Sequence, residues 1–259
     1  MNVLFFGDVI GKNGRLALKK FLPHVKEDYK IDIVVANGEN AAGGVGLTPE
    51  TADELLTYGV DVITGGNHIF AHKEMIEAFD DNSLAVVRPL NYPKCVIGKG
   101  FWLKNNVAIV NIMGRVFING SFDCPFDCMD KFLQENHELP KIIIVDLHAE
   151  ATSEKRALGY YLDGRVSAVL GTHTHVSTAD EQILPKGTAY ITDVGMCGAE
   201  YSVIGDEVSD VIGRFTTGIQ TRLNVSKDKK QIINGVFINI DEISGKALKI
   251  ERISKEVQL

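Results

Sequence analysis

Two histidines in one short segment are the first residues whose types and spacing suit chemistry. They lie in the sequence Gly-Thr-His-Thr-His at 171–175, directly after a β-favouring run at 166–170. Side chains two residues apart in extended backbone point the same way, so we expect His173 and His175 to face one cleft. Two convergent imidazoles could form half of a metal site. Because such a pair also occurs by chance, the interpretation depends on how the other strands end.

Ligand-type side chains also follow other apolar runs along the chain. Four further predicted strands deliver carboxylate, carboxamide or imidazole groups, namely Asp8, Glu39 with Asn40, Asn67 with His68, and His148. Taken singly, each has an ordinary alternative, such as a helix cap for the aspartate or a structural role for a lone histidine. Random loops would rarely supply this set after five apolar strands. Since ligands bind beyond the carboxyl ends of strands in open α/β sheets, the joint pattern predicts a metal centre there.

The mixture of ligand types narrows the choice of metal. Carboxylate, carboxamide and imidazole groups together suit borderline divalent ions, so we expect iron or manganese, with zinc as the alternative. The lack of cysteine ligands argues against a structural zinc site. Six or more ligands exceed the needs of one tetrahedral ion and fit two ions that share a carboxylate, an arrangement used in phosphoryl transfer.

The elements that must position these groups follow an α/β pattern. Strand signals alternate with helix signals, which is typical of largely parallel strands. Strands are expected at 3–6, 31–36, 60–64, 142–146 and 166–170. Helices are expected from about Arg15 with a break near Pro23, from Pro49 with Thr48 as its N-cap, at 71–79 and at 153–162. Later strands are antiparallel in character, and no linker or repeat interrupts the expected single domain over residues 1–259.

Composition limits the classes of partner. A net charge of −7 argues against a protein that binds long nucleic acids, which usually requires a basic field. The first apolar run is too short for a signal peptide, and no segment reaches membrane-spanning length. The four scattered cysteines are therefore expected to be free thiols in the reducing cytoplasm.

The ligand-bearing segments resemble the ordered blocks of the calcineurin-like metallophosphoesterases. Within that superfamily, the chain resembles the YmdB-like bacterial phosphodiesterases over essentially its full length, including the segments at 148–155 and 190–196. The common superfamily pattern begins D-x-H, whereas Ile10 stands in the histidine's place here. Its second block usually contains aspartate and arginine, whereas this chain has Gly-Glu-Asn at 38–40. Both departures fit the YmdB-like group, in which a glutamate bridges the metals.

The resemblance implies a fold and a reaction. The expected fold is an α/β metallophosphoesterase-type β-sandwich of mixed sheets flanked by helices, with the active site at the carboxyl ends of strands. The expected reaction is hydrolysis of small phosphodiesters by a metal-bridging hydroxide. The favoured substrates are 2′,3′-cyclic nucleotides, with 3′,5′-cyclic nucleotides as the alternative. A homo-oligomer, a dimer or a tetramer, is expected on the same basis.

The resemblance also assigns roles to residues by position. One ion would be held by Asp8, Glu39 and His175, with Asn40 as an additional ligand in place of the missing histidine. The other would be held by Glu39 with three further ligands, namely Asn67, His148 and His173. His68 would stabilise the transition state and protonate the leaving alkoxide.

Three residues are weaker candidates for substrate contact. Thr152 and Ser153 begin a predicted helix near His148, so their hydroxyls could donate to a phosphate or cap the helix. Arg115 lies in an irregular stretch and could contact a phosphate or face solvent.

The sequence leaves two rival functions open. One is a non-catalytic regulatory or scaffolding module with a degenerate metal site. The other is a metal-dependent amidohydrolase, in which the histidine pair usually follows the first strand.

Overall fold

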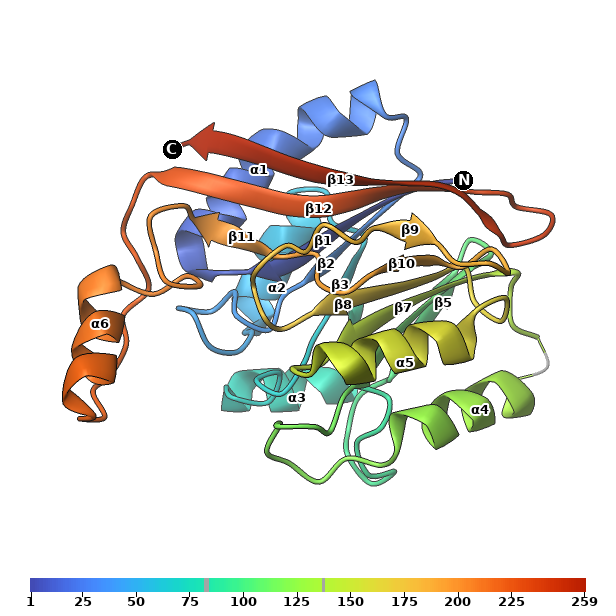
Figure 1. Ribbon diagram of the computed structural model, residues 1–259, viewed down its shortest axis with the longest axis horizontal. Helices are drawn as coiled ribbons and strands as arrows, with labels where there is room; N and C mark the ends of the chain where they lie inside the picture. Colours follow the sequence, from blue (N-terminus) through green and yellow to red (C-terminus); the bar gives the residue numbers. More distant parts are fainter. Residues whose placement is uncertain (82–83, 137) are drawn as a thin grey trace.

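The computed structural model describes residues 1–81, 84–136 and 138–259. It has an α/β fold in which two mixed β-sheets pack face to face with helices on their outer faces (Figure 1). The expected sandwich of mixed sheets flanked by helices is confirmed. None of the helices in the described part of the chain is long and apolar enough to cross a membrane.

The first sheet contains the amino-terminal strands and the carboxyl-terminal hairpin. Its strands are β1 (Asn2–Val9), β2 (Ile33–Asn37), β3 (Val62–Thr64), β4 (Val86–Val87), β11 (Met196–Ala199), β12 (Lys230–Ile240) and β13 (Ala247–Gln258). Within the described residues they have the order β13-β12-β11-β1-β2-β3-β4. Strands β1 to β4 are parallel, whereas β12 runs antiparallel to β1 and to β13.

The second sheet contains the middle of the chain. Its strands are β5 (Phe101–Lys104), β6 (Val107–Met113), β7 (Ile142–His148), β8 (Ala168–Thr172), β9 (Gln182–Ile183) and β10 (Ala189–Ile191). They have the order β5-β6-β7-β8-β10-β9 in the described structure, with a parallel centre and antiparallel edges.

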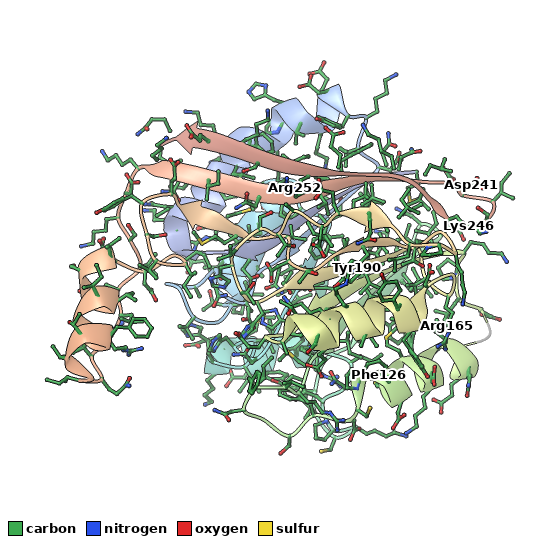
Figure 2. The ribbon with its side chains drawn as sticks, in the orientation of Figure 1. Phe126, Arg165, Tyr190, Asp241, Lys246 and Arg252 are labelled. Atoms are coloured by element: carbon green, nitrogen blue, oxygen red, sulfur yellow. The ribbon has the colours of Figure 1, made fainter. Side chains whose placement is uncertain are left out.

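Alternate residues of the central strands enter different layers of the core. In β1, Val3 and Phe5 pack between the two sheets, whereas Leu4 and Phe6 pack under the helices of the first sheet. Residues 3–6 of β1 are all apolar because both faces of this strand are buried. Tyr190 of β10 is buried in the layer between the second sheet and its helices (Figure 2).

Helices cover the outer faces of both sheets. The first sheet carries α1 (Gly11–Asp28), α2 (Pro49–Thr57) and α3 (Lys73–Asp81), and the second carries α4 (Pro125–Glu135) and α5 (Thr152–Leu162). Thr48 caps α2 as expected, because its hydroxyl accepts from the backbone N–H of Thr51 at 3.2 Å. The sixth helix, α6 (Val208–Thr217), stands away from both sheets (Figure 1).

Three local predictions differ from the structure. Helix α1 begins at Gly11 instead of Arg15 and continues through Pro23. Asp8 lies inside β1, whose last two residues pair with β11. The predicted capping of α5 by Thr152 or Ser153 is wrong, because Ala151 is the N-cap and no side chain caps this end. The four cysteines are free thiols, as expected.

Candidate metal centre

The predicted ligands meet where the carboxyl ends of both sheets come together. Asp8 lies near the end of β1, Glu39 and Asn40 follow β2, and Asn67 follows β3 in the first sheet. In the second sheet, His148 ends β7, and His173 and His175 follow β8. Parallel strands of one sheet deliver their loops to the same edge, and packing of the two sheets brings both edges together.

Four ligands form a first cluster around His148, which is fully buried. Its Nε2 lies 2.9 Å from Oε1 of Glu39, 3.0 Å from Nδ1 of His173 and 3.2 Å from Oδ1 of Asn67. One N–H cannot satisfy three such neighbours at once. Four groups with lone pairs converge instead on one small volume, which is the geometry of ligands around an ion.

Buried side chains fix the orientation of the His148 ring. The hydroxyl of Thr172 donates to Oδ1 of Asp146 at 2.6 Å and accepts from Nδ1–H of His148 at 2.9 Å. Asn37 of the first sheet donates to Oδ2 of Asp146 at 3.0 Å and so joins the two sheets. With Nδ1–H donating to Thr172, Nε2 of His148 can bind a metal once it has released its proton, the usual arrangement for a histidine ligand.

The remaining ligands form a second cluster. Nδ2 of Asn40 lies 3.3 Å from both Oδ1 of Asp8 and Nε2 of His175, and His175 Nε2 lies 3.5 Å from the same Asp8 oxygen. Nδ1–H of His175 donates to the carbonyl of Ile204 at 2.8 Å, which directs Nε2 toward Asp8. Exchanging the oxygen and nitrogen of the Asn40 amide would present an oxygen to an ion at this point.

The two histidines of the 171–175 segment therefore belong to different clusters. The expected alternation of extended backbone is wrong here, because His173 and His175 have φ values of 97° and 63°. Such left-handed conformations are uncommon for residues other than glycine and cluster at functional sites. The loop, not a continuing strand, directs the two rings apart.

Glu39 and Gly66 show how closely the backbone approaches the ligands. Oε2 of Glu39 accepts from the backbone N–H of His68 at 2.9 Å, while its other oxygen faces His148. A Cβ at Gly66 would lie 2.2 Å from the glutamate oxygen and 2.4 Å from His148 Nε2. Only glycine fits at this position.

These residues fit a metal ion. Ligand atoms of Glu39, His148 and His173 all lie within 4.8 Å of one another. One carboxylate oxygen, two imidazole nitrogens and a nearby carboxamide form a donor set suited to manganese, iron or zinc. The geometry supports a metal-binding group in the first cluster.

Within each cluster, a carboxylate and an imidazole carry opposite charges. Burial lowers the pKa of His148 and His175, but the nearby carboxylates, Glu39 and Asp8 respectively, outweigh it and raise both to about 9. The same pairing lowers the pKa values of both carboxyl groups, although burial opposes the change. His173 differs, because burial and the neighbouring His148 lower its pKa to about 4.

Above the ligands lies an open cavity of about 280 Å³. Its wall includes His68, which was predicted to act there, and Glu150, which was not. Oε2 of Glu150 lies 3.1 Å from Nε2 of His173, so this carboxylate can orient the imidazole. The position of Glu150 was a usable signal, because it lies two residues after His148, which ends β7.

The three weaker candidates do not line this cavity. Thr152, Ser153 and Arg115 are all exposed. The backbone N–H of Arg115 donates to the carboxylate of Glu154 at 2.9 Å, which holds the loop after β6 beside α5. The structure therefore brings the seven predicted ligands and His68 together, but leaves these three outside.

Comparisons with known proteins agree over nearly the whole chain. The family model described as YmdB-like protein matches residues 4–253. A 2′,3′-cyclic-nucleotide 2′-phosphodiesterase of Bacillus subtilis (strain 168) is 47% identical over 257 residues, covering 98% of this chain and 96% of that protein.

Two solved structures share the fold. One is a hypothetical protein from Thermus thermophilus, with a TM-score of 0.91, 43% identity and 99% coverage of both chains. The other, titled a novel phosphatase from Mycoplasma pneumoniae, has a TM-score of 0.91 and 37% identity, covering 100% of this chain and 94% of that chain. With a family model and relatives that span both sheets and every ligand segment, this chain belongs to the YmdB-like family.

Proposed function

We propose that this protein is a dinuclear metal-dependent phosphodiesterase that hydrolyses cyclic nucleotides, with 2′,3′-cyclic nucleotides favoured over 3′,5′-cyclic ones. The observation that carries the proposal is the pair of ligand clusters beneath one open cavity. The activity named for the Bacillus subtilis relative supports the choice of substrate. Iron and manganese are the proposed metals, with zinc as the alternative.

Each cluster would hold one ion, and Glu39 would serve both. Asp8, Asn40 and His175 would bind one ion, while Asn67, His148 and His173 would bind the other. Bound ions would activate water and neutralise charge on the phosphate oxygens. The ligands would hold the positive charge of the ions beside the cavity, where a substrate phosphate can approach.

His68 is the proposed general acid. Its side chain lines the cavity, and its backbone N–H is fixed by the Glu39 carboxylate at 2.9 Å. The ring is half-buried and has access to the cavity, so it can donate a proton to a leaving alkoxide. Because the residue is anchored through its backbone, the ring is free for this role.

A combined metal and activity measurement tests the proposal. Metal content per chain is determined, and the same sample is assayed with 2′,3′- and 3′,5′-cyclic nucleotides, a simple phosphodiester and a peptide-like amide. We expect about two ions per chain and phosphodiester hydrolysis that a chelator abolishes.

Other outcomes would favour the rival functions. A protein that binds metal but hydrolyses nothing would be a regulatory or scaffolding module. Cleavage of the amide alone would indicate an amidohydrolase, and a metal-free, inert protein would contradict the proposal.

A further inference from the structure

A fully buried ion pair lies behind the metal centre. Nζ of Lys155, on α5, is 2.6 Å from Oδ2 of Asp193, which follows β10. Both side chains are shielded from solvent, with exposed fractions of 0% and 1%. Because desolvation offsets much of the attraction between buried charges, such a pair contributes little net stability compared with apolar packing. Its contacts suggest a different role.

The pair holds the loop that carries the two histidines. Lys155 Nζ donates to the backbone carbonyl of Thr172 at 2.8 Å. Asp193 Oδ2 accepts from both the backbone N–H of Thr174 at 3.1 Å and its hydroxyl at 2.8 Å. These two threonines flank His173, one of the two histidines with left-handed backbone. The buried charges thus restrain a loop whose conformation is costly by itself.

Asp193 also connects this loop to the strand that carries Asp8. Its Oδ1 accepts from the backbone N–H of Gly195 at 2.9 Å, and the carbonyl of Gly195 accepts from the backbone N–H of Asp8 at 3.1 Å. The two backbone segments approach so closely that a Cβ at Gly7 would lie 1.7 Å from the Gly195 carbonyl oxygen. One carboxylate therefore links segments from both sheets that supply ligands to both clusters.

We propose that Lys155 and Asp193 are positioning residues that set the spacing of His173, His175 and Asp8 for metal binding. Asp193 is the acceptor that fixes the loop and the turn at 193–195. Lys155 neutralises this carboxylate and holds its Oδ2 toward Thr174. The inference rests on the proposed function, since it assigns the pair to the same metal centre.

The test is a Mn²⁺ titration of the chelator-treated, full-length Asp193→Asn protein. Asparagine keeps the size of the side chain but replaces one acceptor oxygen with an NH₂ group and removes the charge that faces Lys155. We expect Mn²⁺ to bind about 10- to 100-fold more weakly, the range for losing a residue that orients metal ligands.

Asp163→Asn is the matched control. Asp163 is 6% exposed and accepts from the backbone N–H groups of Lys186 at 3.0 Å and Thr188 at 3.4 Å. It precedes the amino end of β8, whereas the metal centre lies beyond the carboxyl end of that strand. This variant should lower Tm but leave Mn²⁺ affinity unchanged.

Thr174→Val provides a second test in case Asp193→Asn does not fold. It removes the hydroxyl that donates to Asp193 at a half-buried position, so the fold should tolerate it. Mn²⁺ affinity should fall about tenfold, as for one hydrogen bond to a charged group.

The outcomes separate this inference from the proposed function. Wild-type Mn²⁺ affinity in either folded variant, with a Tm loss like that of Asp163→Asn, would make the pair purely structural and overturn the inference. A wild-type protein that binds none of Mn²⁺, Fe²⁺ and Zn²⁺ would instead contradict the proposed function, and this inference with it.

Discussion

The two ligand clusters differ in what holds them. In the first, donor atoms lie 2.9–3.2 Å from His148 Nε2, and the buried residues Asp146 and Thr172 orient the ring from within the second sheet. In the second, the spacings are 3.3–3.5 Å, and His175 is oriented by a single loop carbonyl, that of Ile204. A ring that is oriented by side chains buried within a sheet is held more rigidly than one that depends on a loop carbonyl.

The segment around Ile204 is a further reason to expect the second cluster to be less rigid than the first. Ile204 has a φ of 49°, which is rare for a β-branched residue, and 49% of its surface is exposed. The chain continues from it toward α6, which stands away from both sheets (Figure 1). We therefore expect the first cluster to bind metal more tightly, and the second to adjust when an ion binds.

The largest expected effect comes from Glu39→Gln, which tests whether the clusters share a ligand. If Glu39 serves both, the neutral amide should weaken binding of both ions and reduce turnover to the level of chelator-treated protein. Metal content and phosphodiester hydrolysis measured on one sample give the answer. Retention of one ion per chain would show that the glutamate belongs to the first cluster alone.

His68→Ala should separate chemistry from metal binding in both clusters. Turnover should fall by roughly 10²- to 10⁴-fold, the range for a lost general acid, while metal content stays unchanged. His72→Ala is the control, because this nearby histidine contacts the Val45 carbonyl at 2.9 Å and does not line the cavity. Loss of metal along with His68 would mean that it is a ligand.

Thr172→Val should weaken metal binding in the first cluster but not in the second. Without the hydroxyl, His148 Nδ1 loses its acceptor and Asp146 loses a donor, so metal affinity there should fall about 10- to 100-fold. Thr188→Val is the control, since its hydroxyl is also buried but bonds to the Val166 carbonyl at 2.7 Å, away from the ligands. Equal weakening of metal binding in both clusters would contradict a role of Thr172 specific to the first.

The protons released on metal binding report whether the imidazole of each cluster is protonated in the metal-free protein. The pKa values of His148 and His175, each raised to about 9, mean that both rings are protonated in metal-free protein at pH 7. Each cluster should therefore release one proton when it binds an ion, and apparent affinity should rise about tenfold per pH unit for each proton below pH 9. Calorimetric titrations in buffers of different ionisation enthalpy count these protons.

The stability of the metal-free protein should fall as pH rises, whereas its metal affinity should increase. A pKa raised by folding stabilises the folded state fully below the unfolded-state value, about 6.5 for histidine. This stabilisation is lost as pH rises through about 9. The Tm of chelated protein should thus decline between these values while metal affinity increases; a flat Tm would contradict the protonated pairs.

The smallest expected effect is that of Ile204→Asn. Asparagine tolerates left-handed backbone, so the carbonyl that holds His175 should stay in place. Affinity in both clusters should change by less than about threefold, because backbone and not side chain orients the ring. A large loss confined to the second cluster would show that the isoleucine side chain is also needed.

The ligands were predictable because each follows an apolar run in the sequence. A buried parallel strand is recognisable by its composition, and whatever follows it lies at the ligand-binding edge. The family resemblance assigned His173 and His175 to different ions, and their separate neighbours agree with that assignment. The expected alternation of extended backbone at these two residues was wrong. Left-handed φ values at two histidines have no marker in sequence.

The supporting residues were not predictable in the same way. Lys155 and Asp193 are 38 positions apart, and nothing in either local sequence indicates that they meet. Helix α6 is a different case, because Val208, Val211, Ile212 and Phe215 have helical spacing and could have predicted it. Its exposed Phe215 departs from the rule that such a face is buried.

The position of β1 within its sheet also affects how the protein matures during synthesis. Strand β1 is made well before β12, yet its residues Asn2 to Phe6 pair with β12, which spans residues 230–240. Until then one apolar edge of β1 lacks its partner, and such edges promote aggregation. Nascent chains that stop before β12 should therefore depend on chaperones.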